Sequence, residues 1–238
     1  MKLAVVGYGK MGREVEAVAR ERGHEPEIVR RGSAFPAGVP VGIDFTRADA
    51  VLANTRAALG AGARYVIGTT GWDAEADELA RLVAEAKGGV VHAANFSLGV
   101  NLFYKVVREA ATLFARFPDY DPYVLERHHR QKKDAPSGTA KALARILEGA
   151  GGPRPHAATT LEGALADDRF HVAALRAGGI VGEHTVGFDS GGDEILLEHR
   201  ARSRRGFALG AVLAAEWIAS RTGVFGFDAV LAGLDQRV

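Results

Sequence analysis

Residues 126–139 read ERHHRQKKDAPSGT and combine two histidines, several cations and the start of a predicted helix. Imidazole exchanges a proton near neutral pH, so His128 or His129 can act as a general acid. Lys132 adds a positive charge, and Ser137, Gly138 and Thr139 open the helix, where free backbone N–H groups bind anions. Cations this close together repel one another unless an anion lies among them. The segment therefore predicts a site for a small carboxylate or phosphate that also receives a proton.

Two other interpretations of this segment remain open. A solvated basic loop followed by a helix cap would show the same residues. A metal site is disfavoured and none is predicted, because no third histidine or carboxylate lies at ligand spacing and the lysines repel cations. Side chains alternate along a strand, so His128 and His129 point to opposite faces unless the chain bends. One of the two histidines is enough for catalysis.

A second motif lies at the N-terminus, where a glycine pattern separates an apolar run from a helical one. G-x-G-x-x-G in that context predicts a pyrophosphate site, because glycines admit the phosphates and the helix N-terminus offers N–H groups. A tight turn without any ligand is the alternative. The predicted cofactor residues here are Gly7, Tyr8, Gly9, Lys10, Met11 and Gly12.

The end of the second predicted strand indicates which dinucleotide binds. An acidic residue there suits the ribose hydroxyls of NAD, whereas arginine suits the 2′-phosphate of NADP. The chain has Arg30 and Arg31 and no carboxylate at this point. We therefore expect NADPH to be preferred, with Arg30 as a cofactor residue and NADH still possible. The alternative is that both arginines are merely solvated.

Two further segments follow predicted strands and contain small or hydroxyl residues. Ligands of a doubly wound sheet bind beyond the carboxyl ends of its strands. Such residues leave room for a nicotinamide and can hydrogen-bond its carboxamide, although tight turns would have a similar composition. The expected cofactor residues are Gly68, Thr69, Thr70, Ala93, Ala94, Asn95 and Phe96.

The elements that must position these residues alternate strand and helix in the first part of the chain. Strands are predicted at 2–7, 25–31, 41–46, 64–71 and 90–96, and helices at 11–23, 48–63 and 73–89. Strands separated by helices form βαβ units and a parallel sheet. A helix over 97–117 follows, and its spacing predicts a buried face of Leu102, Phe103, Val106, Val107, Ala110, Leu113 and Phe114.

After Pro118 the pattern changes. Strands are predicted at 123–129, 179–189 and 194–203, the last two joined by a hairpin turn at 190–193, with a helix over 137–151 and a loop over 151–160. A helix over 206–221 should bury Leu209, Val212, Leu213 and Trp217 before a short tail. The fold class is α/β: a Rossmann-like dinucleotide-binding domain over 1–121 and 206–238, and an α+β substrate-binding and oligomerisation domain with a mixed sheet over 122–205.

Composition excludes several classes of protein. The chain has 238 residues, a formal net charge of +1 and no cysteine. Disulfides, thiolate metal sites and cysteine nucleophiles are thus excluded, and no overall charge attracts nucleic acid or membrane. No apolar stretch approaches the length of a membrane span. We expect a cytoplasmic protein whose partner is a small molecule.

The motifs together resemble those of the 4-hydroxy-tetrahydrodipicolinate reductase family. The resemblance is carried by E-x-H-H-R-x-K-x-D-A-P-S-G-T from Glu126 to Thr139, and by DFT at 44–46, IGTTGW at 67–72, ANFSLGVN at 94–101 and RAGGIVGEHTVGF at 176–188. The order is that of the family, and nearly the whole chain is covered. Two departures concern the cofactor: the glycine loop is one residue shorter than the common form, and the acidic residue that often ends the second strand is absent.

The resemblance implies NAD(P)H-dependent reduction of a cyclic dicarboxylate in lysine and diaminopimelate biosynthesis. It makes His128 the proton donor, Lys132 a second donor or charge stabiliser, and His129, Ser137, Gly138 and Thr139 the residues that hold the substrate. It also implies a homotetramer built through the sheet of the substrate domain. The alternatives are another two-domain amino-acid or sugar dehydrogenase, or an NADP-binding sensor without catalysis.

Overall fold

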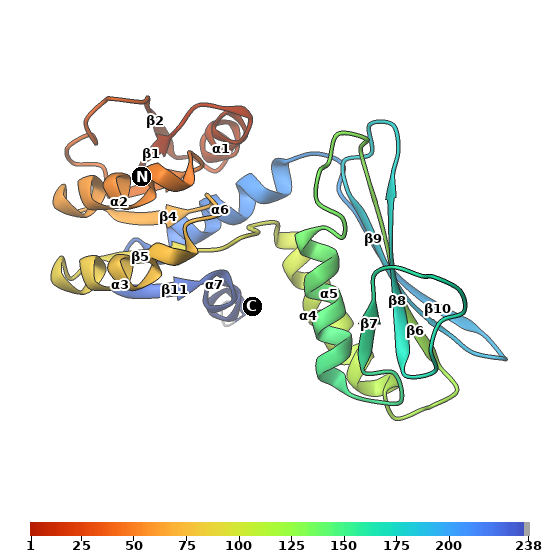
Figure 1. The fold of residues 1–238 in the computed structure, drawn as a ribbon. Helices are drawn as coiled ribbons and strands as arrows, with labels where there is room; N and C mark the ends of the chain where they lie inside the picture. The colour runs from red at the N-terminus through yellow and green to blue at the C-terminus, as the bar shows by residue number, and fades with distance from the viewer. Residues whose placement is uncertain (236–238) are drawn as a thin grey trace. The chain divides into compact units, whose positions relative to one another are not determined.

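A computed structural model describes residues 1–235, and Figure 1 shows its ribbon. The contacts between residues divide the chain into two compact units, Met1–Leu98 with Arg204–Val238 and Gly99–Ser203. The expected range 206–238 ends in residues 236–238, which lie outside the described residues. Each unit is built around its own sheet, and each holds one of the two motif groups.

The first unit contains a parallel sheet of six strands in the order β11-β5-β4-β3-β1-β2. Its strands are β1 (Lys2–Val6), β2 (Glu25–Val29), β3 (Val41–Asp44), β4 (Arg64–Ile67), β5 (Gly89–His92) and β11 (Gly223–Gly226). Its helices are α1 (Lys10–Glu21), α2 (Val51–Gly60), α3 (Ala76–Glu85), α6 (Arg205–Ile218) and α7 (Phe227–Asp235), with short 3₁₀ turns at Ala48–Ala50 and Asp73–Glu75. The predicted parallel βαβ arrangement is confirmed.

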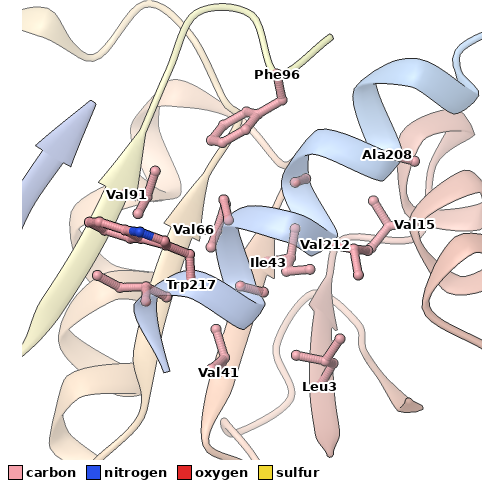
Figure 2. Close-up of a cluster of buried hydrophobic side chains, with 14 of the residues drawn as sticks. Leu3, Val15, Val41, Ile43, Val66, Val91, Phe96, Ala208, Val212 and Trp217 are labelled. Carbon is pink, nitrogen blue, oxygen red and sulfur yellow. The ribbon is translucent and has the colours of Figure 1, made fainter. Parts of the chain in front are cut away.

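Alternate residues of β1, β4 and β5 enter two different cores. Leu3 and Val5 of β1 pack with α1, α6 and α7, whereas Ala4 and Val6 pack with α2 and α3. In Figure 2, Val212 and Trp217 of α6 lie against Val41, Ile43, Val66 and Val91 of three neighbouring strands. Burial on both faces explains why β1, β4 and β5 consist mostly of apolar residues.

The second unit contains a mixed sheet of five strands in the order β10-β9-β6-β8-β7. The strands are β6 (Asp121–His128), β7 (His156–Ala158), β8 (Arg169–Arg176), β9 (Glu183–Asp189) and β10 (Glu194–Arg200). The helices α4 (Leu98–Phe114) and α5 (Gly138–Ala150) cover one face, where Phe103, Leu143 and Phe170 belong to a single core. The expected hairpin at 190–193 joins β9 to β10.

Several expectations differ from the structure. Helix α4 buries Phe103 and Val107, but Leu102, Val106 and Leu113 are exposed, so the predicted apolar face was too wide. The loop expected at 151–160 contains β7, the tail contains β11 and α7, and β8 was not predicted. The division after Leu98 comes earlier than the expected boundary at 121–122, because α4 packs into the second core.

Among the residues that the structure describes, we find no helix with the length and apolar character needed to cross a bilayer.

Candidate active site

The glycine-rich turn after β1 has the geometry of a pyrophosphate-binding turn. Gly7 has φ +86°, in the left-handed region that favours glycine. A Cβ on Gly12 would lie 2.2 Å from the Gly7 carbonyl oxygen, so only glycine lets α1 approach β1 this closely. A Cβ on Gly9 would meet nothing within 4 Å. Gly9 caps α1, which is long enough to present a helix N-terminus to an anion. The turn therefore fits a dinucleotide phosphate.

A cleft of about 540 Å³ lies beside this turn and is large enough for a nucleoside. Arg30 and Arg31 line it at the end of β2, together with Gly7, Gly9 and Thr46. The Arg30 guanidinium lies over the Tyr8 ring, 5.3 Å from its centroid. The one carboxylate among the described lining residues, Asp49, is already paired with Arg47 at 2.8 Å. The exposed cations that follow β2, Arg30 and Arg31, are thus available to a phosphate.

Asp44 accepts hydrogen bonds from both the loop that follows β3 and the loop that follows β4. Its carboxylate is fully buried, and Oδ1 accepts from the Thr46 backbone N–H at 2.7 Å and from Thr69 Oγ1 at 3.1 Å. Oδ2 accepts from Asn54 Nδ2 and from the Tyr65 hydroxyl, each at 2.9 Å. The hydrogen bonds satisfy both oxygens of a buried charge. They also fix the position of Thr46, which lines the cleft.

The predicted cofactor residues of the later loops divide into two groups. Thr69 is buried and its hydroxyl is used by Asp44, and the Phe96 ring packs in the core shown in Figure 2. Thr70 and Ala94 are exposed, and Gly68, Ala93 and Asn95 are half-buried. The Asn95 side chain accepts from the Ser97 backbone N–H at 2.8 Å. The side chains of Thr69 and Phe96 thus serve the fold.

In the second unit, a polar cluster lies where β6 ends beside the N-terminus of α5. Glu126 is fully buried, and its Oε1 accepts from the Ser137 backbone N–H at 2.9 Å and from Arg176 Nη2 at 2.6 Å. Its Oε2 lies 3.4 Å from His128 Nε2 and 3.7 Å from His184 Nε2. The two imidazole Nε2 atoms are 3.4 Å apart. Five polar groups from four elements therefore meet at one end of the sheet.

The electrostatics of the cluster lower the pKa of both imidazoles. Burial lowers the pKa of His128, and Lys132 and Arg176 lower it further, against the opposing effect of Glu126. Burial lowers the pKa of His184 to about 4, with a further contribution from His128. The pKa of Glu126 is lowered as well: burial raises it, but the hydrogen bonds from Ser137 and Arg176 outweigh burial.

The remaining predicted substrate residues surround this cluster. The Lys132 ammonium donates to Asp134 Oδ1 at 2.7 Å, and His129 is half-buried. The Ser137 hydroxyl is buried as the N-cap of α5 and accepts from the Ala140 backbone N–H at 3.2 Å. Gly138 is exposed and Thr139 half-buried at the first turn of the helix. The predicted helix start at Ser137 is therefore present, and His128 lies close to it.

Three residues of the cluster had received no role from the sequence: Glu126, Arg176 and His184. The reason is strand pairing. Glu126 is directly opposite His184 in the antiparallel pair β6–β9, and His128 is opposite Arg176 in the parallel pair β6–β8. These residues are far apart in the sequence, and β8 was not predicted. The sequence signal that existed was alternation, which places Glu126 and His128 on the same face of β6.

Glu126, His128 and His184 are also a group that could hold a metal ion, since one ligand atom from each lies within 4.8 Å of the others. The sequence argument considered only ligands at local spacing and found no third histidine or carboxylate. The third histidine is His184 of β9, which strand pairing brings in, and the carboxylate is Glu126 of β6.

The two units combine a Rossmann-like nucleotide-binding fold with an α+β unit that contains a histidine cluster beside a helix N-terminus, and they define a two-domain dinucleotide-dependent oxidoreductase. Family models described as dihydrodipicolinate reductase match residues 25–96 for the N-terminus and residues 99–231 for the C-terminus. The chain belongs to the dihydrodipicolinate reductase family.

Individual relatives agree with this assignment. A 4-hydroxy-tetrahydrodipicolinate reductase of Christiangramia forsetii is 34% identical, over 98% of this chain and 99% of the relative. The protein of that name from Methanoculleus marisnigri is 43% identical, over 79% of this chain and 74% of the relative. A solved dihydrodipicolinate reductase of a Paenisporosarcina species, with dipicolinate bound, has a TM-score of 0.74 and 25% identity, covering 95% of this chain and 97% of that one.

Proposed function

We propose that this protein reduces 4-hydroxy-tetrahydrodipicolinate to tetrahydrodipicolinate with NAD(P)H and loss of water, a step of lysine and diaminopimelate biosynthesis. The observation that carries the proposal is the cluster at the end of β6, in which His128 lies beside Glu126, His184 and the N-terminus of α5. It supplies a proton donor next to an anion site, as reduction of a dicarboxylate requires.

In the proposed reaction, loss of the 4-hydroxyl as water leaves a conjugated imine. The reduced nicotinamide supplies a hydride to this ring, and a proton completes the reduction. His128 supplies that proton, and the Lys132 ammonium stabilises the negative charge that develops on the conjugated system. The buried Glu126 Oε2 lies 3.4 Å from His128 Nε2, close enough for its negative charge to stabilise a protonated ring.

The two substrate carboxylates account for the charges around the cluster. Gly138 and Thr139 present the first turn of α5, and His129 and Lys132 add donors and charge. A bound dianion would also raise the pKa of His128, because nearby negative charge favours the imidazolium. Substrate binding would thus prepare the acid that the reaction needs.

For the cofactor, we propose that NADPH is preferred and that NADH is also accepted. Support comes from Arg30 and Arg31, which line the nucleotide cleft where a carboxylate would favour NADH. Arg30 is already oriented by its contact with the Tyr8 ring. The open space above Gly9 would admit the pyrophosphate.

We further propose a homotetramer assembled through the sheet of the second unit. The face of that sheet opposite α4 and α5 exposes Leu175 and Leu196, whose exposed fractions are 43% and 49%. Large apolar side chains on a sheet face are typical of subunit interfaces. Light scattering coupled to size-exclusion chromatography measures the mass directly, and a monomeric mass would contradict the proposal.

A coupled assay tests the reaction. The preceding synthase generates the substrate in situ from pyruvate and aspartate semialdehyde, and nicotinamide absorbance is followed with NADPH and NADH in parallel. We expect rapid oxidation that requires the synthase. Folded protein that binds NADPH but oxidises neither cofactor would overturn the proposed reaction and favour a different dehydrogenase.

A further inference from the structure

We propose that Glu126, His128 and His184 form a reversible binding site for a divalent transition-metal cation such as Zn²⁺, and that the bound metal inhibits the enzyme. The ligand atoms closest to one another in this group are Glu126 Oε2, His128 Nε2 and His184 Nε2. Metal binding is independent of the proposed function. Only the inhibition rests on that function, because it assumes that His128 donates the proton.

The separations of the ligand atoms are those of a tetrahedral zinc site. Zinc binds imidazole nitrogen and carboxylate oxygen at about 2.0–2.2 Å, so neighbouring ligands of a tetrahedron are about 3.3–3.6 Å apart. The two Nε2 atoms are 3.4 Å apart, and Glu126 Oε2 lies 3.4 Å from His128 and 3.7 Å from His184. Two edges of the triangle therefore fall within this range and the third is 0.1 Å longer, so little movement is needed to admit the ion.

The rings are also oriented as ligands. Their centroids are 5.2 Å apart whereas their Nε2 atoms are 3.4 Å apart, so each ring turns its Nε2 edge toward the other. In the absence of a cation, two such nitrogens can satisfy each other only if one carries a proton and the other does not. A metal satisfies the lone pairs of both.

An independent observation is the state of the carboxylate. Glu126 is fully buried, and its Oε2 accepts no hydrogen bond from the residues that the structure describes. The other oxygen, Oε1, already accepts from Ser137 and Arg176. A buried carboxylate oxygen without a donor is costly and rare. It forms one corner of the triangle of ligand atoms, where a bound cation would compensate it.

The donor set selects the metal. Two imidazole nitrogens and one carboxylate oxygen suit Zn²⁺, Co²⁺ or Cu²⁺, whereas Mg²⁺ and Ca²⁺ require mainly oxygen ligands. The Ser137 hydroxyl, 3.3 Å from His184 Nε2, lies beside the position of a fourth ligand.

The surroundings limit the affinity. The cations Lys132 and Arg176 are paired with Asp134 and Glu126, so the neighbourhood has no net negative charge to attract a metal. His184 Nδ1 has no hydrogen-bond partner among the described residues, and loss of such a partner costs a metal site about 10–100-fold in affinity. We therefore expect micromolar, reversible binding rather than a resident structural ion.

Cobalt spectroscopy tests the site in the wild-type chain, freed of any affinity tag and measured without substrate, since cyclic dicarboxylates chelate metals themselves. Co²⁺ should produce the intense visible bands of four- or five-coordinate cobalt at one equivalent per chain, and Zn²⁺ should displace it. Only the weak bands of octahedral cobalt would overturn the proposal.

Variants locate the ligands. Glu126→Gln and His184→Asn should each weaken Co²⁺ binding at least about tenfold, given that even second-shell losses reach that size. His171→Asn, a half-buried histidine of β8 outside the cluster, should bind as wild type does. Unchanged binding in both cluster variants would refute the site. The urea unfolding transition of each variant, compared with that of wild type, serves as the folding control.

A measurement on the wild type remains decisive even if these variants unfold. In ¹⁵N spectra of the histidine rings, Zn²⁺ should shift the Nε2 resonances of two of the 8 histidines to metal-bound values. Zinc should also inhibit reduction in the coupled assay when added in excess over the substrate. A protein with the cobalt bands but no reductase activity would refute the proposed function and leave the metal site standing.

Discussion

Glu126 of β6 and His184 of β9 are direct partners across an antiparallel pair, and this pairing brings the carboxylate within 3.7 Å of the imidazole. Both side chains are almost fully buried, at 0% and 4% exposure. Burial at the end of a sheet requires compensation, which comes from Arg176 on the other neighbouring strand and from the start of α5. The polar groups around His128 therefore come together only when β6, β8, β9 and α5 are all in place.

The Glu126–Arg176 pair should be important for stability. We expect Glu126→Gln to lower the free energy of unfolding by about 1–3 kcal/mol, the cost of leaving a buried charge incompletely paired. Urea denaturation measures the change, with the exposed Glu162→Gln as the matched control. Equal stability of both variants and wild type would show that the pair is energetically neutral.

His128 and Lys132 should affect turnover far more than folding. His128→Ala or Lys132→Ala is expected to lower kcat by about 10²–10⁴-fold, the range for loss of a general acid. Thr139→Val should act mainly by raising KM for the substrate. The coupled assay gives both constants. If His128→Ala stayed within a few-fold of wild-type kcat, another group must donate the proton.

The cofactor preference should depend on the end of β2. In an Arg30→Ala, Arg31→Ala double variant, the ratio of kcat/KM for NADPH to that for NADH should fall, because the cations that face the 2′-phosphate are gone. Activity with NADH should persist, which separates this effect from unfolding. An unchanged ratio would mean that neither arginine recognises the phosphate.

Alanine substitutions at two glycines of the same turn should have different effects, one on stability and the other on NADPH binding. Gly12→Ala places a methyl group 2.2 Å from the Gly7 carbonyl oxygen, so we expect a clearly lower Tm. Gly9→Ala meets open space in the protein and has ordinary backbone angles, with φ −85° and ψ −156°. Its Tm should be close to that of wild type while NADPH binds more weakly. Thermal unfolding and a fluorescence titration of NADPH distinguish the two, and tight NADPH binding by Gly9→Ala would exclude close approach of the phosphates.

Acid should lower the stability of the first unit, because Glu216 of α6 becomes protonated. Burial raises the pKa of Glu216, but hydrogen bonds from Arg22 and His24 at 2.7 Å outweigh burial and lower the pKa below its usual 4.5. As pH falls, Glu216 is therefore protonated in the unfolded chain before it is protonated in the folded protein. Its contribution to the free energy of unfolding is fully present above pH 4.5 and is lost as pH falls through its lower pKa in the folded protein. Between pH 6 and pH 4, wild type should lose more stability than Glu216→Gln. Parallel loss in both proteins would contradict the linkage.

The sequence predicted what depends on local patterns. The glycine turn, the parallel strands of the first unit, the helix start at Ser137 and the exposed arginines after β2 all follow from a few neighbouring residues. Strand β7 was missed because its three residues show no period, and Leu102 and Val106 were assigned to the core because periodicity cannot distinguish a half-covered helix from a covered one. His184 required the register of β6 against β9, which no short stretch of sequence contains.

Helix α6 and strand β11 belong to the last part of the chain, yet they pack in the sheet and core of the first unit. During synthesis, β1 to β5 leave the ribosome long before α6, so one face of the nucleotide-binding sheet stays open to water while 99–203 are being made. The second unit is continuous in the chain and can close its core first. In a nascent chain arrested before Arg205, the second unit should therefore be folded while residues 1–98 still lack α6 and β11. Those N-terminal residues are the part of the chain most in need of a chaperone.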